Sequence, residues 1–458
     1  MKTKIEGILR GLRDNVVYAL GCTEPVAIAL ACARARETLG EQPERIILKI
    51  DRFTARNACS VGVPSTGERG IRIAAALGAQ VGKPEKGLML LEGVSPLVIT
   101  AAKKFLEEKE VRILIEDTRD IYISAELSSE DKTAIVVIEG SHTHVARVEL
   151  TGKVSYEDSE KSATEEELDM FAGIDLPEAV EIVESLPLEE IEFMEQGFQL
   201  NLAAAELGIR EQAAFGYADY LEKLMESGLL PASAIALARV EAAAASGARM
   251  AGMDSPVISS FGSGNQGIVI YSALGAMARE EGFLNPWSMM AEKAPHALHP
   301  IAGNRGKDSA EKSREHLLRA VALAHLITGI SRFYTGILGP YCGAAVATAA
   351  SAAVGCVYLA GGDLDQMENA FQLTVASTQG IFCDGAKESC ALKVSMGAEA
   401  AVQNAYLAME GQQAPREMGL IGDNFKGTLE SFDLLSKEIH SDDVILRMLL
   451  EKSHTVAD

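Results

Sequence analysis

The segment Phe333–Gly362, FYTGILGPYCGAAVATAASAAVGCVYLAGG, decides the fold, because no charged residue interrupts it. Alanine, glycine, serine and threonine dominate it and Pro340 divides it, so its transfer into a bilayer is weakly favourable compared with a span of leucine, isoleucine and valine. A helix buried in a large helical core explains this composition better than a membrane span. The segment therefore predicts a protein whose helices pack through small side chains.

Other alanine-rich runs continue this helical pattern through the second half of the chain, among them Ala234–Ala251, Arg314–Ile330 and Ala391–Met409. Small side chains let helices approach closely. These runs predict a compact, all-helical domain over residues 170–458.

The first part of the chain has a different pattern, with short strand-like runs joined by polar turns. These runs are Arg45–Phe53, Lys86–Leu91, Val111–Glu116, Ile121–Leu127, Thr133–Glu139 and His144–Leu150. The last three predict an antiparallel meander. We therefore expect an α+β protein, with N-terminal helices over 1–40 that pack on the helical domain and a small mixed α/β domain over 41–155. An acidic, exposed connection follows, from Thr151 to about Leu168.

The composition excludes several functional classes. A formal net charge of -23 over 458 residues argues against a nucleic-acid or anionic membrane surface, which needs clustered lysine and arginine. Seven cysteines are too sparse for a disulfide framework, and the N-terminal segment lacks the apolar core of a signal peptide. We expect a cytoplasmic protein.

The cysteines fall into two groups by their predicted positions. Cys22, Cys342 and Cys390 lie at the starts of predicted helices, where unpaired N–H groups and the helix dipole favour thiolate. Cys383 lies in the glycine-rich loop before Cys390. Two others, Cys32 and Cys356, lie within helices as core residues, and Cys59 is left open between core and site.

Three thiolates from separate segments suit an iron–sulfur cluster or a zinc ion. Zinc motifs usually place two cysteines two to four positions apart, and the sequence has no such pair. Three buried cysteines without a metal remain an equal alternative at this point.

The segment Gly262–Gly267 matches the pattern G-x-G-x-x-G of dinucleotide-binding loops. That fingerprint needs a second strand ending in an acid about twenty residues later, whereas Glu280 and Glu281 lie in a helical pattern. We therefore expect no NAD. A cradle for a small carboxylate, with N–H groups opening a helix, explains the segment better, and a tight turn without a ligand remains the alternative.

Taken together, five stretches resemble the L-cysteine desulfidase family, which is related to the iron–sulfur L-serine dehydratases. They are Gly21–Pro25, Asn57–Gly70, Gly262–Gly267, Tyr341–Gly343 and Cys383–Cys390. The resemblance implies that Cys342, Cys383 and Cys390 hold a [4Fe-4S] cluster and that Cys22 matches an additional N-terminal cysteine of the family. It also implies that the helical domain corresponds to the dehydratase alpha, or catalytic, domain.

The reaction implied by this resemblance is α,β-elimination of L-cysteine to sulfide, pyruvate and ammonia. Cys22 would be the general base at Cα, and an open iron would help the sulfur to leave. We expect no pyridoxal phosphate, because no motif supports a Schiff-base lysine. We expect the substrate to contact three residues of the cradle, Gly264, Asn265 and Gln266, and two residues outside it, Asn57 and Lys387.

Two alternatives stay open: an L-serine dehydratase, which needs the same Lewis acid, and a noncatalytic iron–sulfur sensor. The expected partner is a small amino-acid substrate, with no nucleic acid and no membrane. We also expect a homodimer, because the alanine-rich helices have neutral faces.

Overall fold

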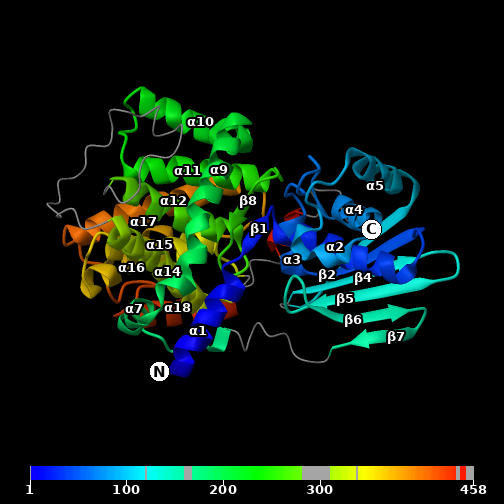
Figure 1. Cartoon of the computed structure of the whole chain (residues 1–458), viewed down its shortest axis with the longest axis horizontal. Helices are drawn as coiled ribbons and strands as arrows, with labels where there is room; N and C mark the ends of the chain where they lie inside the picture. Colours follow the sequence, from blue (N-terminus) through cyan, green and yellow to red (C-terminus); the bar gives the residue numbers. More distant parts are fainter. Residues whose placement is uncertain are drawn as a thin grey trace.

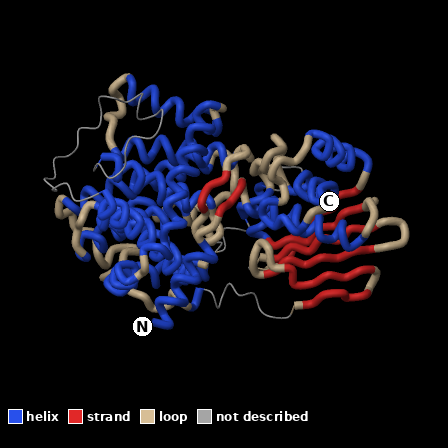
Figure 2. Tube along the Cα trace, viewed as in Figure 1, coloured by secondary structure: helices blue, strands red, loops and turns tan. Residues whose placement is uncertain are grey.

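The computed structural model describes residues 2–118, 121–158, 168–280, 310–336, 339–439 and 444–449. Two parts lie side by side: a large helical part and a smaller part built on a sheet (Figure 1). Colouring by secondary structure separates them clearly (Figure 2). The expected α+β class is confirmed. Residues 159–167 of the expected connection, and 281–309 and 450–458 of the expected helical domain, lie outside the described residues.

The smaller part contains a sheet with the strand order β3-β2-β4-β5-β6-β7. Its strands are β2 (Arg45–Asp51), β3 (Glu110–Glu116), β4 (Tyr122–Ser128), β5 (Thr133–Glu139), β6 (Val145–Leu150) and β7 (Lys153–Glu157). β2 pairs with β3 in parallel, and every other pair of neighbouring strands in this sheet is antiparallel. The predicted meander is confirmed, and β7 extends it into the segment expected to be an exposed connection.

One face of this sheet is covered by helices (Figure 1). Strand β5 buries Ala134, Val136 and Ile138, whereas the residues between them are partly exposed, as expected for a sheet with one covered face. The helical elements of this part are α2 (Thr23–Leu39), α3 (Arg52–Ala58), α4 (Ile71–Val81), η1 (Pro84–Met89) and α5 (Pro96–Glu108). The strand predicted at Lys86–Leu91 is wrong: Pro84 opens a 3₁₀ helix there, and Gly87 has a φ of 54°.

The larger part is a bundle whose helices share one apolar core. Its elements are α1 (Lys2–Asn15), α7 (Leu176–Ser185), α8 (Leu188–Ile191), η2 (Glu192–Glu195), α9 (Gln196–Arg210), α10 (Ala213–Glu226), α11 (Ala234–Met250), α12 (Gly264–Glu280), α14 (Ala310–Thr335), η3 (Ala344–Thr348), α15 (Ala349–Leu359), α16 (Leu364–Thr378), α17 (Cys390–Met409) and α18 (Phe425–Glu438). Helix α11 buries four consecutive alanines, 242–245, so neighbouring helices surround it.

Within the uncharged segment quoted first, residues 344–359 form a buried helix, as predicted. Residues Ala344–Thr348 form one π-helical turn, and α15 continues from it with every residue buried. A π turn inside a helix often marks a functional position. Among the described residues, no helix is long and apolar enough to cross a membrane.

The first forty residues divide between the two parts, although we expected all of them to pack on the helical domain. Helix α1 places Ile8 and Leu12 in the helical core, whereas α2 places Ile28 and Ala29 in the core of the sheet part. Between them, β1 (Tyr18–Leu20) pairs antiparallel with β8 (Pro256–Ile258) of the helical part. The chain therefore crosses from one part to the other just before Cys22.

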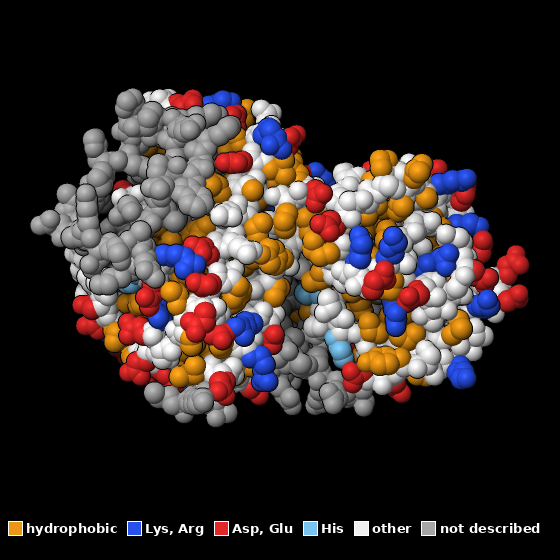
Figure 3. All heavy atoms as spheres, in the orientation of Figure 1, with side chains coloured by type: hydrophobic (Ala, Val, Ile, Leu, Met, Phe, Trp, Pro, Cys, Tyr) orange, Lys and Arg blue, Asp and Glu red, His pale blue; other side chains and the backbone are white. Residues whose placement is uncertain are grey.

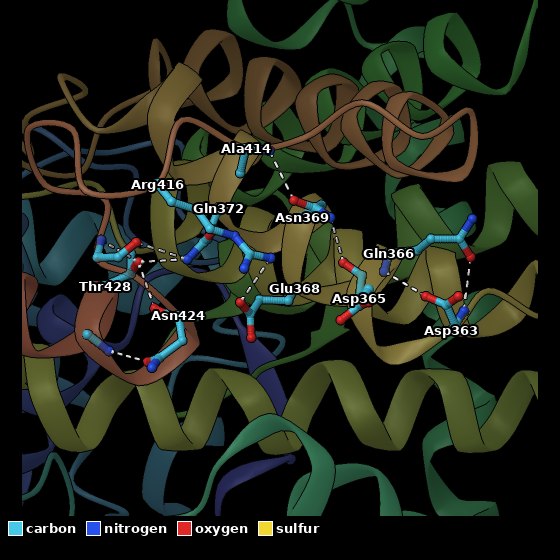
Figure 4. Close-up of polar contacts among 12 residues, drawn as sticks. Asp363, Asp365, Gln366, Glu368, Asn369, Gln372, Ala414, Arg416, Asn424 and Thr428 are labelled. Carbon is cyan, nitrogen blue, oxygen red and sulfur yellow. Dashed lines mark hydrogen bonds and ion pairs between the residues drawn. The ribbon is translucent and has the colours of Figure 1, made fainter.

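A polar network on α16 fixes the chain that leads into α18 (Figure 4). Asn369 Oδ1 accepts a hydrogen bond from the Ala414 N–H, and Gln372 Nε2 donates to the Gly422 carbonyl. Arg416 forms an ion pair with Glu368. These contacts hold α18, whose Phe432 packs edge-on against Tyr341 beside Cys342.

Candidate active site

A pocket lies where the two parts meet, and residues of both parts line it. The surface is indented between the two parts on the face seen in Figure 3, where acidic and basic side chains are interspersed among the described residues. Both parts contribute to the pocket lining: Cys22, Thr23, Glu24, Arg56 and Asn57 from the sheet part and its entry, and Arg249, Met250, Gly262, Ser263, Asn265, Gln266, Arg332, Gly339, Tyr341, Cys342, Gly343, Ala344, Cys383, Gly385, Ala386 and Cys390 from the helical part.

Cys342 and Cys383 are aligned by a short antiparallel bridge between their loops. Tyr341 pairs with Phe382 in this bridge, and their rings stack with centroids 5.9 Å apart. The Cys342 N–H donates to the Ile381 carbonyl at 2.9 Å, and the Cys383 N–H donates to the Pro340 carbonyl at 2.8 Å. The backbone itself therefore sets the spacing of two cysteines that are 41 positions apart in sequence.

Cys390 is positioned by the loop between Cys383 and α17. Its N–H donates to the Lys387 carbonyl at 2.8 Å, and its sulfur lies 3.6 Å from the Gly385 carbonyl oxygen. Asp384 forms ion pairs with both Lys387 and Lys393, which ties the loop to α17. All three cysteines therefore face one pocket from a braced loop and two helix starts.

Cys342 and Cys390 do not gain the thiolate character that we expected from helix N-termini. Burial raises the pKa of Cys342 to about 12, and repulsion from Cys383 and Cys390 adds to this. Burial also raises the pKa of Cys390, and Lys387 lowers it by less. Desolvation outweighs the helix dipole here, so these thiols need a positively charged partner to ionise.

The donor set can be tested against the metal groups that bind cysteine. Within the described ranges, no three histidine, cysteine or acidic side chains converge closely enough to hold a single metal ion. A [4Fe-4S] cluster binds each thiolate at a different iron, so its ligands stand around a larger body and need not converge on one point. Three thiols on one pocket wall suit a cluster better than a zinc ion.

Cys22 is the N-cap of α2 and forms a hydrogen-bonded group with two residues of the sheet part. Its thiol donates to Glu24 Oε2 at 2.8 Å, and Asn57 Nδ2 donates to Glu24 Oε1 at 2.6 Å. Burial, followed by the charge of Glu24, raises the pKa of Cys22 well above its usual value, so the proton lies on sulfur at rest. Burial also tends to raise the pKa of Glu24, but attraction to His142 and these hydrogen bonds lower it overall.

The turn Gly262–Gly267 opens α12 beside two buried arginines. A Cβ on Gly264 would collide with the guanidinium of Arg249, and one on Gly343 would collide with Arg332. Gln266 is oriented so that its Nε2 donates to the Ser260 carbonyl at 2.8 Å and its Oε1 accepts from Arg332. Both glycines therefore make room for a cation at the pocket wall.

The structure brings most of the sequence-predicted residues to this pocket. Cys22, Cys342, Cys383, Cys390, Asn57, Asn265 and Gln266 all line it. Gly264 lies just behind the lining, against Arg249. Lys387 is outside the lining, because its Nζ is held by Asp384 and by the Gly385 carbonyl. Asn57 lies in α3 and donates to Glu24.

Four charged residues at this pocket were not predicted from the sequence: Glu24, Arg56, Arg249 and Arg332. Glu24 stands two positions after Cys22, so an acid beside a candidate base was a usable signal. The arginines carried no such signal, because only the fold places them there. Cys59, which the sequence could not assign to core or site, is a core residue. Burial raises its pKa to about 11.

Comparisons with known proteins identify the family of this chain. The family model of the serine dehydratase alpha chain matches residues 85–440. A UPF0597 protein of Clostridium botulinum (strain Hall) is 32% identical over 445 residues, covering 96% of each chain. UPF0597 proteins of Caldanaerobacter subterraneus subsp. tengcongensis and Clostridioides difficile (strain 630) are also 32% identical, over 96% of this chain and 97% and 98% of theirs. The chain belongs to the serine dehydratase alpha chain family.

Proposed function

We propose that this protein is an iron–sulfur-dependent lyase that eliminates sulfide from L-cysteine and yields pyruvate and ammonia. The observation that carries the proposal is one pocket lined by both a three-cysteine set and the Cys22–Glu24 pair. Family membership supports lyase chemistry of the dehydratase type, and the resemblance of the cysteine-bearing stretches supports cysteine as the substrate.

Cys342, Cys383 and Cys390 are the residues that would hold the [4Fe-4S] cluster. Arg332 supports this assignment, because it is buried and is attracted to Cys342 and Cys383, although burial lowers its pKa to about 10. Lys393, half-buried on α17, is likewise attracted to Cys342 and Cys390. Two cations beside three thiols compensate the negative charge of a thiolate-bound cluster. When bound, the cluster supplies a Lewis-acidic iron for the departing sulfur.

Cys22 and Glu24 move the proton in this proposal. The carboxylate of Glu24 accepts the Cys22 proton across their 2.8 Å hydrogen bond, and the thiolate so formed takes the proton from Cα of the substrate. The electron pair of the Cα–H bond forms the Cα=Cβ bond as the Cβ–S bond breaks. The resulting aminoacrylate tautomerises and reacts with water to give pyruvate and ammonia.

The leaving group distinguishes cysteine from serine, the second candidate substrate that the family name favours. Glu24 is the one carboxyl group among the described lining residues, and its oxygens already accept bonds from Cys22 and Asn57. Hydrosulfide is a much weaker base than hydroxide, whose conjugate acid has a pKa of about 15.7, so it leaves Cβ with less proton assistance. The pocket therefore favours sulfur as the leaving atom.

The test is product release by the anaerobically cluster-reconstituted protein, with L-cysteine and L-serine offered separately. We expect pyruvate and sulfide in equal amounts from cysteine, with a higher kcat/KM than for pyruvate from serine. Release from serine alone would change the substrate and keep the mechanism. An intact cluster with no product from either amino acid would overturn the proposal and favour a sensor.

A further inference from the structure

Arg249 is a buried cation that has no carboxylate partner within the described parts of the chain. The residue is 3% exposed, and its Nη1 lies 3.9 Å from the Met250 sulfur, a weak acceptor. Its Nε is buried without a hydrogen-bond partner. An arginine stays protonated at all physiological pH values, and an unpaired buried charge is destabilising. A ligand that brings a negative charge would remove this penalty.

Other buried arginines of the protein show the contrast. Arg279, on the neighbouring helix α12, has a side chain that is 8% exposed and forms an ion pair with Glu241. Arg332 also lines the pocket, but it binds Gln266 and donates to the Gly336 carbonyl at 3.0 Å. Arg56, a third buried arginine of the lining, donates to the Gly339 carbonyl at 3.4 Å. Arg249 differs from Arg56 and Arg332, because the acceptor that it contacts is a thioether and not an oxygen.

A second polar group beside Arg249 is also weakly occupied. The Oδ1 of Asn265 accepts a hydrogen bond from Ser246, whereas its Nδ2 makes a 3.7 Å contact with the same Met250 sulfur. Two donors thus share one thioether, which a carboxylate would outcompete as an acceptor. The absence of a side chain at Gly264 lets the guanidinium reach this position.

Arg249 lies on the Cys22 side of the pocket, since the adjacent Met250 belongs to the same small apolar cluster as Cys22. Its charge acts on Cys22, whereas that of Arg332 acts on Cys342 and Cys383. In an amino acid the carboxylate is attached to Cα and the leaving group to Cβ. A substrate with Cα near Cys22 and its leaving atom near the three cysteines therefore turns its carboxylate toward Arg249.

We propose that Arg249, assisted by Asn265 Nδ2, binds the α-carboxylate of the substrate and restricts the enzyme to amino acids with a free carboxyl group. This inference rests on the proposed elimination at the same pocket. It keeps Asn265 of the expected Gly262–Gly267 cradle as a carboxylate contact and adds Arg249 in place of the expected helpers Asn57 and Lys387, whose donors bind Glu24 and Asp384. The planar guanidinium suits a two-point contact with a carboxylate.

The first test is stability, measured as the midpoint of thermal unfolding of anaerobic protein with and without L-alanine, which has no leaving group. The wild type should be stabilised by L-alanine and not by L-alaninamide. In Arg249→Gln the stabilisation by L-alanine should disappear, while the unliganded midpoint stays equal or rises, because an unpaired charge is gone. A fall of that midpoint, as large as in the matched control Arg279→Gln, would indicate a structural role and overturn the inference.

The second test is selectivity, measured as sulfide release from L-cysteine and L-cysteinamide. We expect the wild type to prefer cysteine, and Arg249→Gln to raise KM for cysteine about 100-fold with a smaller change in kcat. The preference for cysteine over its amide should shrink by a similar factor, and Arg249→Lys should recover part of it. Unchanged KM and unchanged preference in Arg249→Gln would overturn the inference.

The two tests separate this inference from the proposed function. If the wild type binds L-alanine through Arg249 but eliminates nothing from cysteine or serine, the proposed reaction fails and the carboxylate site stands. If cysteine is turned over and Arg249→Gln behaves like the wild type in both assays, the reaction stands and the carboxylate site fails.

Discussion

The thiol of Cys22 and the carboxylate of Glu24 are joined by a 2.8 Å hydrogen bond within the first turn of α2. An acid in this turn is stabilised by the helix dipole. Burial alone would raise the pKa of Glu24, but His142 and the surrounding donors lower it. A charged carboxylate therefore stands beside a protonated thiol at neutral pH, and this is the arrangement from which a general base can be generated.

Replacing Glu24 with glutamine should remove the proton acceptor and preserve the shape of the site. We expect Glu24→Gln to lower kcat about 100-fold at pH 7. In the wild type the pKa of Glu24 is lowered, so this carboxylate stays charged between pH 6 and 8. Titration of Glu24 should therefore not change the wild-type kcat in this range. In the variant the thiol must ionise unaided, so kcat should rise with pH across this range.

The matched control for this prediction is Glu241→Gln, which also removes a buried carboxylate but lies outside the pocket lining. Its pH profile should keep the wild-type shape. If Glu24→Gln also kept the wild-type rate and profile, the carboxylate would serve only to cap α2.

Replacing any one of the three pocket cysteines with serine should remove the cluster. We expect Cys342→Ser, Cys383→Ser and Cys390→Ser to hold less than half of the wild-type iron and sulfide after anaerobic reconstitution, and to lose activity. Cys356→Ala is the control, because Cys356 lies in the helical core. Full iron content in one of the serine variants would remove that cysteine from the ligand set.

Gly264 should affect substrate binding indirectly, because its missing side chain leaves room for Arg249. A Cβ at this position meets the Arg249 side chain, so Gly264→Ala should displace the guanidinium and raise KM for L-cysteine about 10-fold. Gly275→Ala, on the same helix, is the control, because its Cβ would make near-ordinary contacts at 3.4 Å. Equal KM values for the two variants would contradict the placement of Arg249.

The buried side chain of His325 should make the free energy of unfolding depend on pH. Burial lowers its pKa to about 3, and its ring nitrogens contact Ser260 Oγ and the Tyr271 hydroxyl. Below its unfolded pKa of about 6.5 the unfolded chain takes up a proton that the folded chain does not, so the free energy of unfolding falls with falling pH by about 1.4 kcal/mol per unit.

Denaturant unfolding at pH 7 and pH 5 measures this dependence. His325→Gln should lose about 2 kcal/mol less than the wild type over the interval. His144 is the control, since burial tends to lower its pKa but Asp158 and the Glu139 carbonyl raise it overall. A raised pKa stabilises at low pH, so His144→Gln should not reduce the acid loss. An unchanged slope in His325→Gln would contradict the assigned pKa.

Local patterns in the sequence predicted much of the fold. The uncharged segment ending at Gly362 and the alternating runs from Ile121 to Leu150 gave the correct helices and strands, because their signals are local. The pattern over Lys86–Leu91 did not, since Pro84 and the backbone of Gly87 favour a 3₁₀ helix. Nor could local pattern assign α2 to the sheet part, because which core an apolar helix joins depends on tertiary contacts.

The sequence predicted the site residues of a rare type, the cysteines, better than those of a common type, such as arginine. Four cysteines marked the pocket correctly. Their protonation was not predictable, because burial is a property of the folded chain. Arg249 and Lys387 look alike in the sequence as candidate carboxylate binders. Only the fold shows that Asp384 already holds Lys387, while Arg249 faces the pocket without a carboxylate partner in the described parts.

The most direct measurement compares anaerobic wild type and Cys22→Ala at equal iron content, with pyruvate and sulfide release from L-cysteine as the readout. The account predicts equal amounts of both products from the wild type. It predicts a loss of about 1,000-fold or more in Cys22→Ala, with the cluster retained. Wild-type turnover by Cys22→Ala, or a wild type that releases neither product with its cluster intact, would contradict it.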